Sequence, residues 1–247
     1  MDRYNGNKIY ISQDEQEKMQ QTRILIAGAG IGSVIAECAL RIGFEDLVIV
    51  DSGKVTEESL SCQNYTKTDI GKFKAERLAK RLLRINPNAK IQFHNIEADR
   101  ENLQWLVKDV KIAINALGFK TDIPFVLDEL CSAKRIPVLH PYNFGWGAFL
   151  TITKPGSYKL SELSSTKENF DLVLAEYVSR YCTFWNMPNR WMDRIIDTYK
   201  QYSISELSIA SWVVAGHCVN VMFDIITGKE VKYFPKFYFS SLRGDPA

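Results

Sequence analysis

Residues 23–51 restrict the possible folds of this chain more than any other part of the sequence. An apolar strand of residues 24–27 runs into a glycine-rich turn, which is followed by an apolar helix and a second apolar strand ending on Asp51. Glycines let the backbone approach a phosphate closely, and a helix that begins there directs free N–H groups at the anion. The pattern therefore predicts a nucleotide-binding βαβ unit.

The turn departs from the regular G-x-G-x-x-G spacing of such loops. Gly28 and Gly30 fill its first two positions, whereas Ser33 stands at the third and Gly32 comes one residue early. Asp51 follows at the end of the next strand, where an acid is placed to bind ribose hydroxyls. We expect the three glycines and Asp51 to bind a cofactor. The alternative is a tight turn without a ligand, with Asp51 an ordinary loop acid.

Composition narrows the class of protein. The 247 residues carry a net charge of +2 with both signs interspersed, which gives no reason to expect nucleic acid or an anionic membrane as partner. We expect no signal peptide, because residues 1–18 contain no apolar segment. The apolar stretch 207–227 includes polar residues and favours a buried helix over a membrane span. Five scattered cysteines fit reduced thiols, so we expect a cytoplasmic protein without a structural zinc site.

The chain alternates predicted helices and strands. A capping box at Ser12 and Glu15 predicts a helix over residues 12–21. Further helices are expected over 71–85, 100–107, 124–134 and 205–226, and strands over 90–94, 111–116 and 136–140. This alternation predicts the α/β class, with a doubly wound, mostly parallel Rossmann-like sheet. Residues 148–153 and 231–239 are rich in β-branched and aromatic residues and predict antiparallel strands added at the C-terminal half.

We expect a single domain over residues 1–247. It comprises a Rossmann-like core (1–155), a crossover and partner-binding segment (156–204), and a C-terminal helix with strands (205–247). The crossover contains many aromatic residues between 168 and 202, at a spacing typical of a packed core. Tyr and Trp are also typical anchors of interfaces, so partner binding remains the alternative.

Five motifs occur in order along the chain and together resemble one family. They are Arg3-Tyr4-Asn5, the glycine loop RILIAGAGIGS, the acid-ending strand LVIVD, the helix start GKFKAE, and RINP at residues 84–87. With these motifs the chain resembles the ThiF/MoeB family, which includes the adenylation domains of ubiquitin-activating enzymes. The resemblance covers residues 3–155 well and 205–242 loosely.

The resemblance implies an activity and its ligands. It implies that the chain binds ATP with Mg²⁺ and adenylates the C-terminal carboxylate of a small ubiquitin-like or sulfur-carrier protein, or of a peptide. It also implies a homodimer or a heterodimer. By the same resemblance Asp51 holds the ribose, Lys74 is catalytic and pairs with phosphate oxygens, and Gln63 contributes to cofactor binding. The alternative for Lys74 is a solvated helix lysine.

Several positions depart from the family pattern. Gly6 replaces an arginine that reaches ATP, and Cys62 replaces a phosphate-binding arginine. The magnesium-binding aspartate is missing after the fourth strand, so magnesium is in doubt and no metal ligand is assigned; Asp122 would substitute only in a rebuilt loop. The zinc cysteines are absent from residues 155–160. Losing preorganised charge stabilisers slows such chemistry, which puts fast adenylation in doubt.

Three further residues have two interpretations each. His140 is expected to be a hydrogen-bonded structural residue, with contact to a ligand as the alternative. Trp146 either packs or caps a substrate channel. Cys182 and Cys62 are expected to be packed thiols, and a reactive thiol is the alternative for each.

Three functions remain in competition. We expect an adenylyltransferase, because Asp51 and Lys74 are retained. Gly6, Cys62 and the missing aspartate favour instead a catalytically diverged nucleotide-binding subunit that pairs with an active partner. The glycine loop would also suit an NAD-dependent oxidoreductase, but such an enzyme needs no lysine at the position of Lys74.

Overall fold

A seven-stranded sheet organises the computed structural model, which describes residues 3–164, 169–198 and 206–244. Its strand order is β3-β2-β1-β4-β5-β6-β7. The strands are β1 (Arg23–Ala27), β2 (Asp46–Val50), β3 (Lys90–His94), β4 (Ile112–Asn115), β5 (Val138–Asn143), β6 (Gly147–Thr153) and β7 (Phe237–Ser241). The first five are parallel, and β6 and β7 are added antiparallel. The predicted fold class is therefore confirmed.

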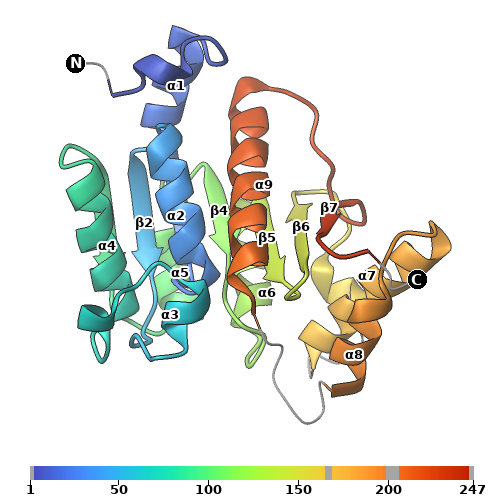
Figure 1. Cartoon of the computed structure of the whole chain (residues 1–247). Helices are drawn as coiled ribbons and strands as arrows, with labels where there is room; N and C mark the ends of the chain where they lie inside the picture. Colours follow the sequence, from blue (N-terminus) through green and yellow to red (C-terminus); the bar gives the residue numbers. More distant parts are fainter. Residues whose placement is uncertain (1–2, 165–168, 199–205, 245–247) are drawn as a thin grey trace.

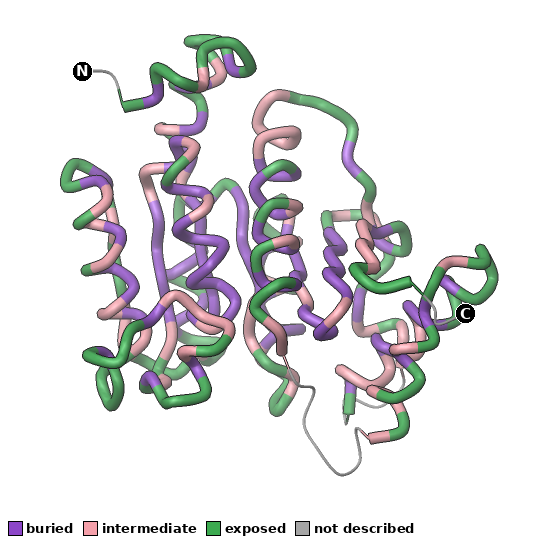
Figure 2. Tube along the Cα trace, viewed as in Figure 1, coloured by how far each residue is buried: buried purple, intermediate pink, exposed green. Residues whose placement is uncertain are grey.

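Helices cover both faces of the sheet (Figure 1). On one face lie α2 (Ile31–Ile42), α4 (Lys74–Ile85) and α9 (Ser208–Thr227), and on the other α5 (Arg100–Leu106) and α6 (Ile123–Ala133). The remaining helices are α1 (Gln13–Gln21), the short α3 (Ser59–Cys62), and α7 (Phe170–Phe184) and α8 (Arg190–Thr198) beside the antiparallel end of the sheet. The central strands are buried on both faces (Figure 2), as their continuous apolar runs predict.

Helix α9 is long and apolar enough to cross a membrane by length and composition alone. It packs instead on α2, β5 and β6, and buries residues such as Val214, Cys218 and Met222 in the core. This agrees with the predicted buried helix. At the other end of the chain, the capping box of Ser12 and Glu15 is formed as predicted at the start of α1.

Three predicted boundaries were wrong. Helix α4 begins at Lys74 and not at residue 71, because Gly71 adopts a φ of 79° outside the helical region. Strand β5 begins at Val138, since the N–H of Ile136 still bonds Cys131 at the end of α6. Residues 231–236 form no strand, because Pro235 has no N–H to donate to a ladder. Residues 168 and 199–202 of the predicted aromatic segment lie outside the described residues.

Candidate functional site

The glycine loop lies at the carboxyl edge of the sheet, between β1 and α2. Gly28 adopts a φ of 94°, and a Cβ at this position would lie 2.3 Å from the carbonyl oxygen of Ala116. The N–H of Gly28 donates to the carbonyl of Val50 (2.9 Å). Only glycine lets the chain turn here while passing so close to the end of β4.

The other two glycines serve the start of α2. Gly30 is its N-cap residue, so the free N–H groups of the first turn open beside it. Gly32 lies inside the first turn, where a Cβ would be 2.8 Å from the Cγ2 atom of Ile26. Gly32 thus allows the close helix–strand packing that the third glycine of such loops provides, one residue early. Its predicted contact with a cofactor stays a prediction.

Asp51 joins the glycine loop to the turn after β2. One carboxylate oxygen accepts the N–H of Ala29 and the other the N–H of Gly53, each at 2.6 Å. A Cβ on Gly53 would lie 2.9 Å from the Asp51 carboxylate. Our sequence analysis missed Gly53, although a glycine two residues after the strand-ending acid is a usable signal. Asp51 therefore fixes the loop, and its role towards ribose stays a prediction.

Polar side chains behind the loop hold its backbone. Ser33 Oγ donates to the carbonyl of Gly30 (2.7 Å) and accepts the N–H of Asn64 (3.0 Å). The hydroxyl of Tyr65 donates to the carbonyl of Ala29 (2.7 Å), and burial raises the pKa of Tyr65 so that it remains a neutral donor. The loop is therefore preorganised before any ligand binds.

Lys74 and Gln63 lie on two sides of the loop. The N–H of Lys74 donates to the carbonyl of Gly53 (2.9 Å), and its side-chain Cδ passes 3.8 Å from the place of a Gly53 Cβ. Lys74 and Asp51 thus flank Gly53. The Nε2 atom of Gln63 would lie 3.5 Å from a Cβ on Gly30, and its Oε1 atom is buried without a hydrogen bond. The structure brings the predicted residues together, while their contacts with a cofactor stay predictions.

Two hollows open beneath the loop and share the strip Ala116–Gly118. The first, which we call the Asp51 hollow, has a volume of about 340 Å³ and is bordered by Gly28, Asp51, Glu97 and Lys120. The second, the Asp171 hollow, measures about 250 Å³ and is bordered by Gly30, Tyr142, Asn143, Asp171 and Glu206. Asp122 is not among the residues that border either hollow, and its substitution for the missing aspartate stays a prediction.

Asp171 and Glu206 are residues that our sequence analysis missed. Burial, and then the charge of Glu206, raise the pKa of Asp171 above its ordinary value. Among the described residues that line the Asp171 hollow, none is Lys or Arg. The hollow therefore places two carboxylates opposite the start of α2 without a cation from its own lining.

Cys62 lies beside this acidic pair. Its thiol donates to a carboxylate oxygen of Glu206 (3.3 Å). Burial and the charge of Glu206 raise the pKa of Cys62, so the thiol stays protonated where the family resemblance led us to expect a cation. Cys182 is fully buried in α7, and burial raises its pKa to about 11. Cys182 is thus a packed thiol, as predicted, whereas Cys62 is half-buried and hydrogen bonded to Glu206.

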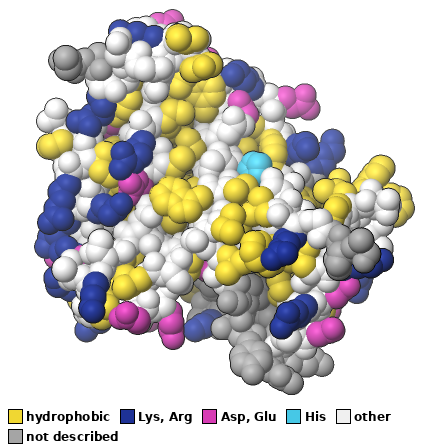
Figure 3. All heavy atoms as spheres, in the orientation of Figure 1, with side chains coloured by type: hydrophobic (Ala, Val, Ile, Leu, Met, Phe, Trp, Pro, Cys, Tyr) yellow, Lys and Arg dark blue, Asp and Glu magenta, His cyan; other side chains and the backbone are white. Residues whose placement is uncertain are grey.

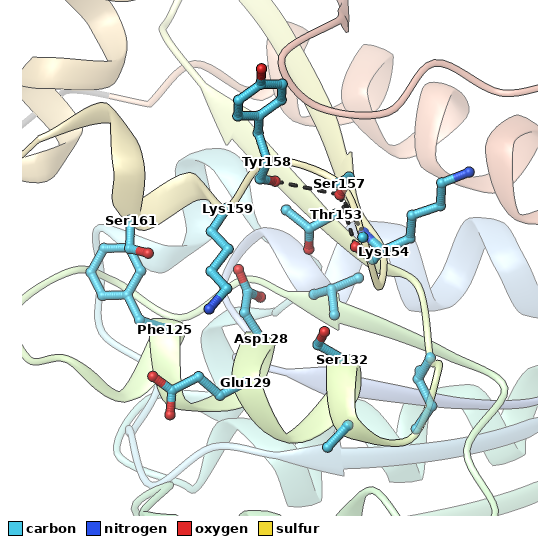
Figure 4. A pocket seen from close by; sticks show the side chains of 14 residues that line it. Phe125, Asp128, Glu129, Ser132, Thr153, Lys154, Ser157, Tyr158, Lys159 and Ser161 are labelled. Carbon is cyan, nitrogen blue, oxygen red and sulfur yellow. Dashed lines mark hydrogen bonds between the residues drawn. The ribbon is translucent and has the colours of Figure 1, made fainter.

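His140 has the predicted structural role. Its side chain is 1% exposed, and its Nε2 atom lies 3.1 Å from Asp128 and 3.3 Å from the hydroxyl of Thr153. Asp128 also borders a third hollow of about 370 Å³, where the side chains of Asp128 and Lys159 extend towards each other (Figure 4). This hollow lies where β5 begins and β6 ends, at the edge of the sheet opposite the glycine loop, and is not part of the nucleotide site.

The loop that carries zinc cysteines in the resembling family is closed here by a serine. Ser157 Oγ accepts the N–H of Lys154 (3.0 Å) and donates to its carbonyl (2.8 Å). The described part of the chain contains no group of three or more His, Cys, Asp or Glu side chains that could hold a metal ion. Hydrogen bonds thus close the turn at this position.

Curated relatives of the chain include proteins named as activating enzymes or adenylyltransferases. SAMP-activating enzyme E1 of Haloferax volcanii is 26% identical over 145 residues, which cover 57% of this chain and 53% of the relative. Sulfur carrier protein ThiS adenylyltransferase of Bacillus subtilis is 29% identical over 163 residues, which cover 63% of this chain and 48% of the relative. The chain therefore spans about half the length of the curated relatives it matches.

Solved structures share the fold at low identity. PaaA superposes with a TM-score of 0.69 at 20% identity, covering 93% of this chain and 63% of PaaA. E. coli MccB with ATP superposes with a TM-score of 0.67 at 16% identity, covering 94% of this chain and 67% of MccB. The ThiF family model matches residues 4–243, nearly the whole sequence, and includes the five ordered motifs except for Arg3. The chain belongs to the ThiF family.

Proposed function

We propose that the protein is an ATP-dependent adenylyltransferase that activates the C-terminal carboxylate of a small protein or peptide. The observation that carries this proposal is the pair of hollows joined beneath one glycine loop. A nucleotide with its ribose beside Asp51 would have its phosphates before Gly30, in the Asp171 hollow. The end of β5 and the start of α7 border the same hollow and leave room for a second substrate.

The proposed reaction exchanges one bond for another at the α-phosphorus of ATP. A carboxylate oxygen of the substrate forms a bond to this phosphorus, and the bond to the bridging oxygen of pyrophosphate breaks. Pyrophosphate leaves with the electron pair of that bond. No proton needs to move, so the protein contributes position and charge stabilisation. The N–H groups at the start of α2 and the ammonium group of Lys74 are suited to this role.

Asp171 and Glu206 fit the magnesium ion that accompanies ATP in such reactions. Magnesium is usually bound by one or two carboxylates together with substrate phosphates and water. Within the described residues neither carboxylate forms an ion pair, and each borders the space before Gly30. We therefore assign these two residues to hold the ion, which when bound would neutralise phosphate charge. The repulsion between them, which after burial contributes to the raised pKa of Asp171, would then be relieved.

The role of Lys74 can be tested with a matched lysine nearby. Lys72 is exposed, two residues earlier, and donates to the carbonyl of Thr68 (2.7 Å). With Mg²⁺ present, Lys74→Ala should weaken ATP binding in calorimetry by roughly 10- to 100-fold, the value of a charge-assisted hydrogen bond. Lys72→Ala should leave it unchanged. Equal losses in both variants would contradict the phosphate role of Lys74.

A second candidate is a nucleotide-binding subunit that leaves catalysis to a partner. The thiol of Cys62 and the absence of Lys and Arg from the described lining of the Asp171 hollow favour it. ATP–pyrophosphate exchange with small β-grasp proteins and C-terminal peptides separates the two candidates. Exchange supports the enzyme, whereas tight ATP binding without exchange for any substrate supports the subunit. Binding of NAD without binding of ATP would contradict both.

A homodimer or heterodimer also remains part of the proposal. Hydrophobic side chains gather on the surface over α9 and towards β7, while Lys and Arg side chains gather over α4 (Figure 3). On α9, Ile209 and Trp212 are 47% and 53% exposed. Apolar surface of this kind is typical of an interface between subunits. Light scattering of the purified chain measures whether it pairs with itself.

A further inference from the structure

A hollow of about 670 Å³ lies beyond Phe144, next to the Asp171 hollow. Its walls come from the turn between β5 and β6, from α8, and from the residues after β7. Three arginines (Arg190, Arg194, Arg243) and two tryptophans (Trp146, Trp191) line it, and none of its described lining residues is Asp or Glu. We call it the arginine groove. Its charge is opposite to that of the neighbouring hollow.

The aromatic walls of the groove are fixed by the sheet. The indole N–H of Trp191 donates to Ser241 Oγ (3.1 Å), and its ring stacks on Phe239 with a centroid distance of 6.5 Å. A Cβ on Gly147 would lie 2.5 Å from this ring, so only glycine lets Trp191 lie directly on β6. The guanidinium of Arg243 lies over the ring of Trp146 at 4.4 Å.

The groove adjoins the Asp171 hollow. Phe144 borders both spaces. Beside it, the amide of Asn143 donates to the carbonyl of Leu207 (2.8 Å) and accepts the N–H of Gly145 (2.8 Å). These bonds hold together the backbone segments on the two sides of the junction. A peptide whose last carboxylate lies before Gly30 would therefore have its preceding residues in the arginine groove.

We propose that the arginine groove binds acidic side chains of the substrate, a few residues before the carboxylate that is adenylated. This inference rests on the proposed function and names the class of substrate. The planar guanidinium group matches a carboxylate, and Trp faces accommodate the peptide backbone and apolar atoms. The groove therefore selects a peptide that carries Asp or Glu a few residues before its C-terminal carboxylate.

The test compares three fluorescent decapeptides with identical C-terminal ends. They carry two Glu, two Ala or two Lys residues at the upstream positions, and binding is followed by anisotropy at low and high salt. The native protein should bind the Glu peptide about tenfold more tightly than the Ala peptide, with the Lys peptide weakest. The preference should shrink as salt rises, because the groove is open to solvent.

Variants locate the preference on the protein. Arg194→Ala and Arg243→Ala should each weaken binding of the Glu peptide about fivefold, and leave the Ala peptide unchanged. Arg194→Lys keeps the charge and should retain most of the preference. Arg180→Ala is the matched control, since Arg180 is exposed on α7 and pairs with Glu176 outside the groove. Circular dichroism shows whether each variant is folded.

The outcomes separate this inference from the proposed function. Equal binding of the three peptides, or a preference that survives the double variant of Arg194 and Arg243, overturns the groove. An equal loss in Arg180→Ala overturns it as well. Calorimetry with ATP is independent of these peptides. If ATP does not bind but the Glu preference persists, adenylation fails and the groove stands; if ATP binds without any preference, the groove alone fails.

Discussion

Two carboxylates, one buried and one half-buried, lie on opposite sides of the glycine loop and differ in their partners. Glu37 of α2, behind the loop, is 3% exposed and accepts hydrogen bonds from Arg81 (2.5 Å), Arg41 (2.7 Å) and Asn64 (3.0 Å). Burial raises its pKa, but the bonds from both arginines outweigh burial and lower it overall. Asp171, in front of the loop, has a raised pKa because of burial and the charge of Glu206.

The two carboxylates differ in role: Glu37 stabilises the fold, and Asp171 borders the hollow in front of the loop. A buried charge is costly unless it is paired, and Glu37 is paired within the chain. Asp171 forms no ion pair among the described residues, and burial together with the charge of Glu206 disfavours its ionised form. This difference supports the magnesium ion that we propose for Asp171 and Glu206.

The largest expected effect concerns this external cation. Without a divalent ion, two carboxylates face the phosphates of ATP, and repulsion at such range costs a few kcal/mol. Removing Mg²⁺ with EDTA should weaken ATP binding to the native protein by roughly 100-fold in calorimetry. In a variant with Asp171→Asn and Glu206→Gln, the same treatment should change binding only a few-fold. An unchanged dependence on Mg²⁺ in this variant would place the ion elsewhere.

The next effect concerns the paired carboxylate. Glu37→Gln removes the charge that holds Arg81 and Arg41, and should lower the unfolding free energy by about 2 kcal/mol at neutral pH. Because the pKa of Glu37 is lowered in the fold, its contribution is present above the ordinary pKa of Glu. The contribution is lost as the pH falls through the lowered value. Urea titrations of the native protein and Glu37→Gln at several acidic pH values measure whether the difference in their unfolding free energies shrinks as the pH falls.

Glu76→Gln is the control for this prediction. Glu76 pairs with Lys80 on the exposed surface of α4, and its pKa is lowered mainly by that pair. Its removal should change stability little, because exposed pairs are screened by water. If Glu37→Gln were as harmless as Glu76→Gln, the buried pairing would not stabilise the fold.

The smallest predicted effect is an increase in stability, in contrast to the loss expected for Glu37→Gln. Asp171→Asn should raise the unfolding free energy by about 1 kcal/mol at neutral pH, because it removes a half-buried charge that burial and Glu206 disfavour. The raised pKa of Asp171 means that its stabilising contribution is present below the ordinary pKa of Asp and lost as the pH rises through the raised value. Native and variant proteins should therefore converge in acid. A variant less stable than the native protein at neutral pH would show that Asp171 is already compensated.

The nucleotide side of the site was predictable because its contacts are local and lie within recognisable motifs. Asp51 bonds Ala29, 22 positions away, and Lys74 lies at the start of a helix marked by its own motif. The acidic pair was not predictable from sequence. Glu206 meets Cys62 across 144 positions, and Asp171 stands at the start of a helix outside every motif. No periodicity or spacing connects such residues before the chain is folded.

The arginine groove was not predictable from sequence for the same reason. Its arginines come from α8 and from the end of the chain, and Trp146 comes from a hairpin turn. Trp146 was predicted to pack or to cap a substrate channel, and the structure places it in the wall of this groove. In the sequence these arginines look like ordinary surface residues. Only the antiparallel strands added after β5 bring them to one place in the fold.

The turn between β5 and β6 has a kinetic consequence. It is closed by the bond from the N–H of Phe144 to the carbonyl of Gly147 (2.9 Å) and is held by two paired strands. A binding wall that is ordered before encounter loses little entropy on association. Changes to the arginines should then alter mainly the rate at which an acidic peptide arrives, whereas changes to the turn should alter how long the peptide stays.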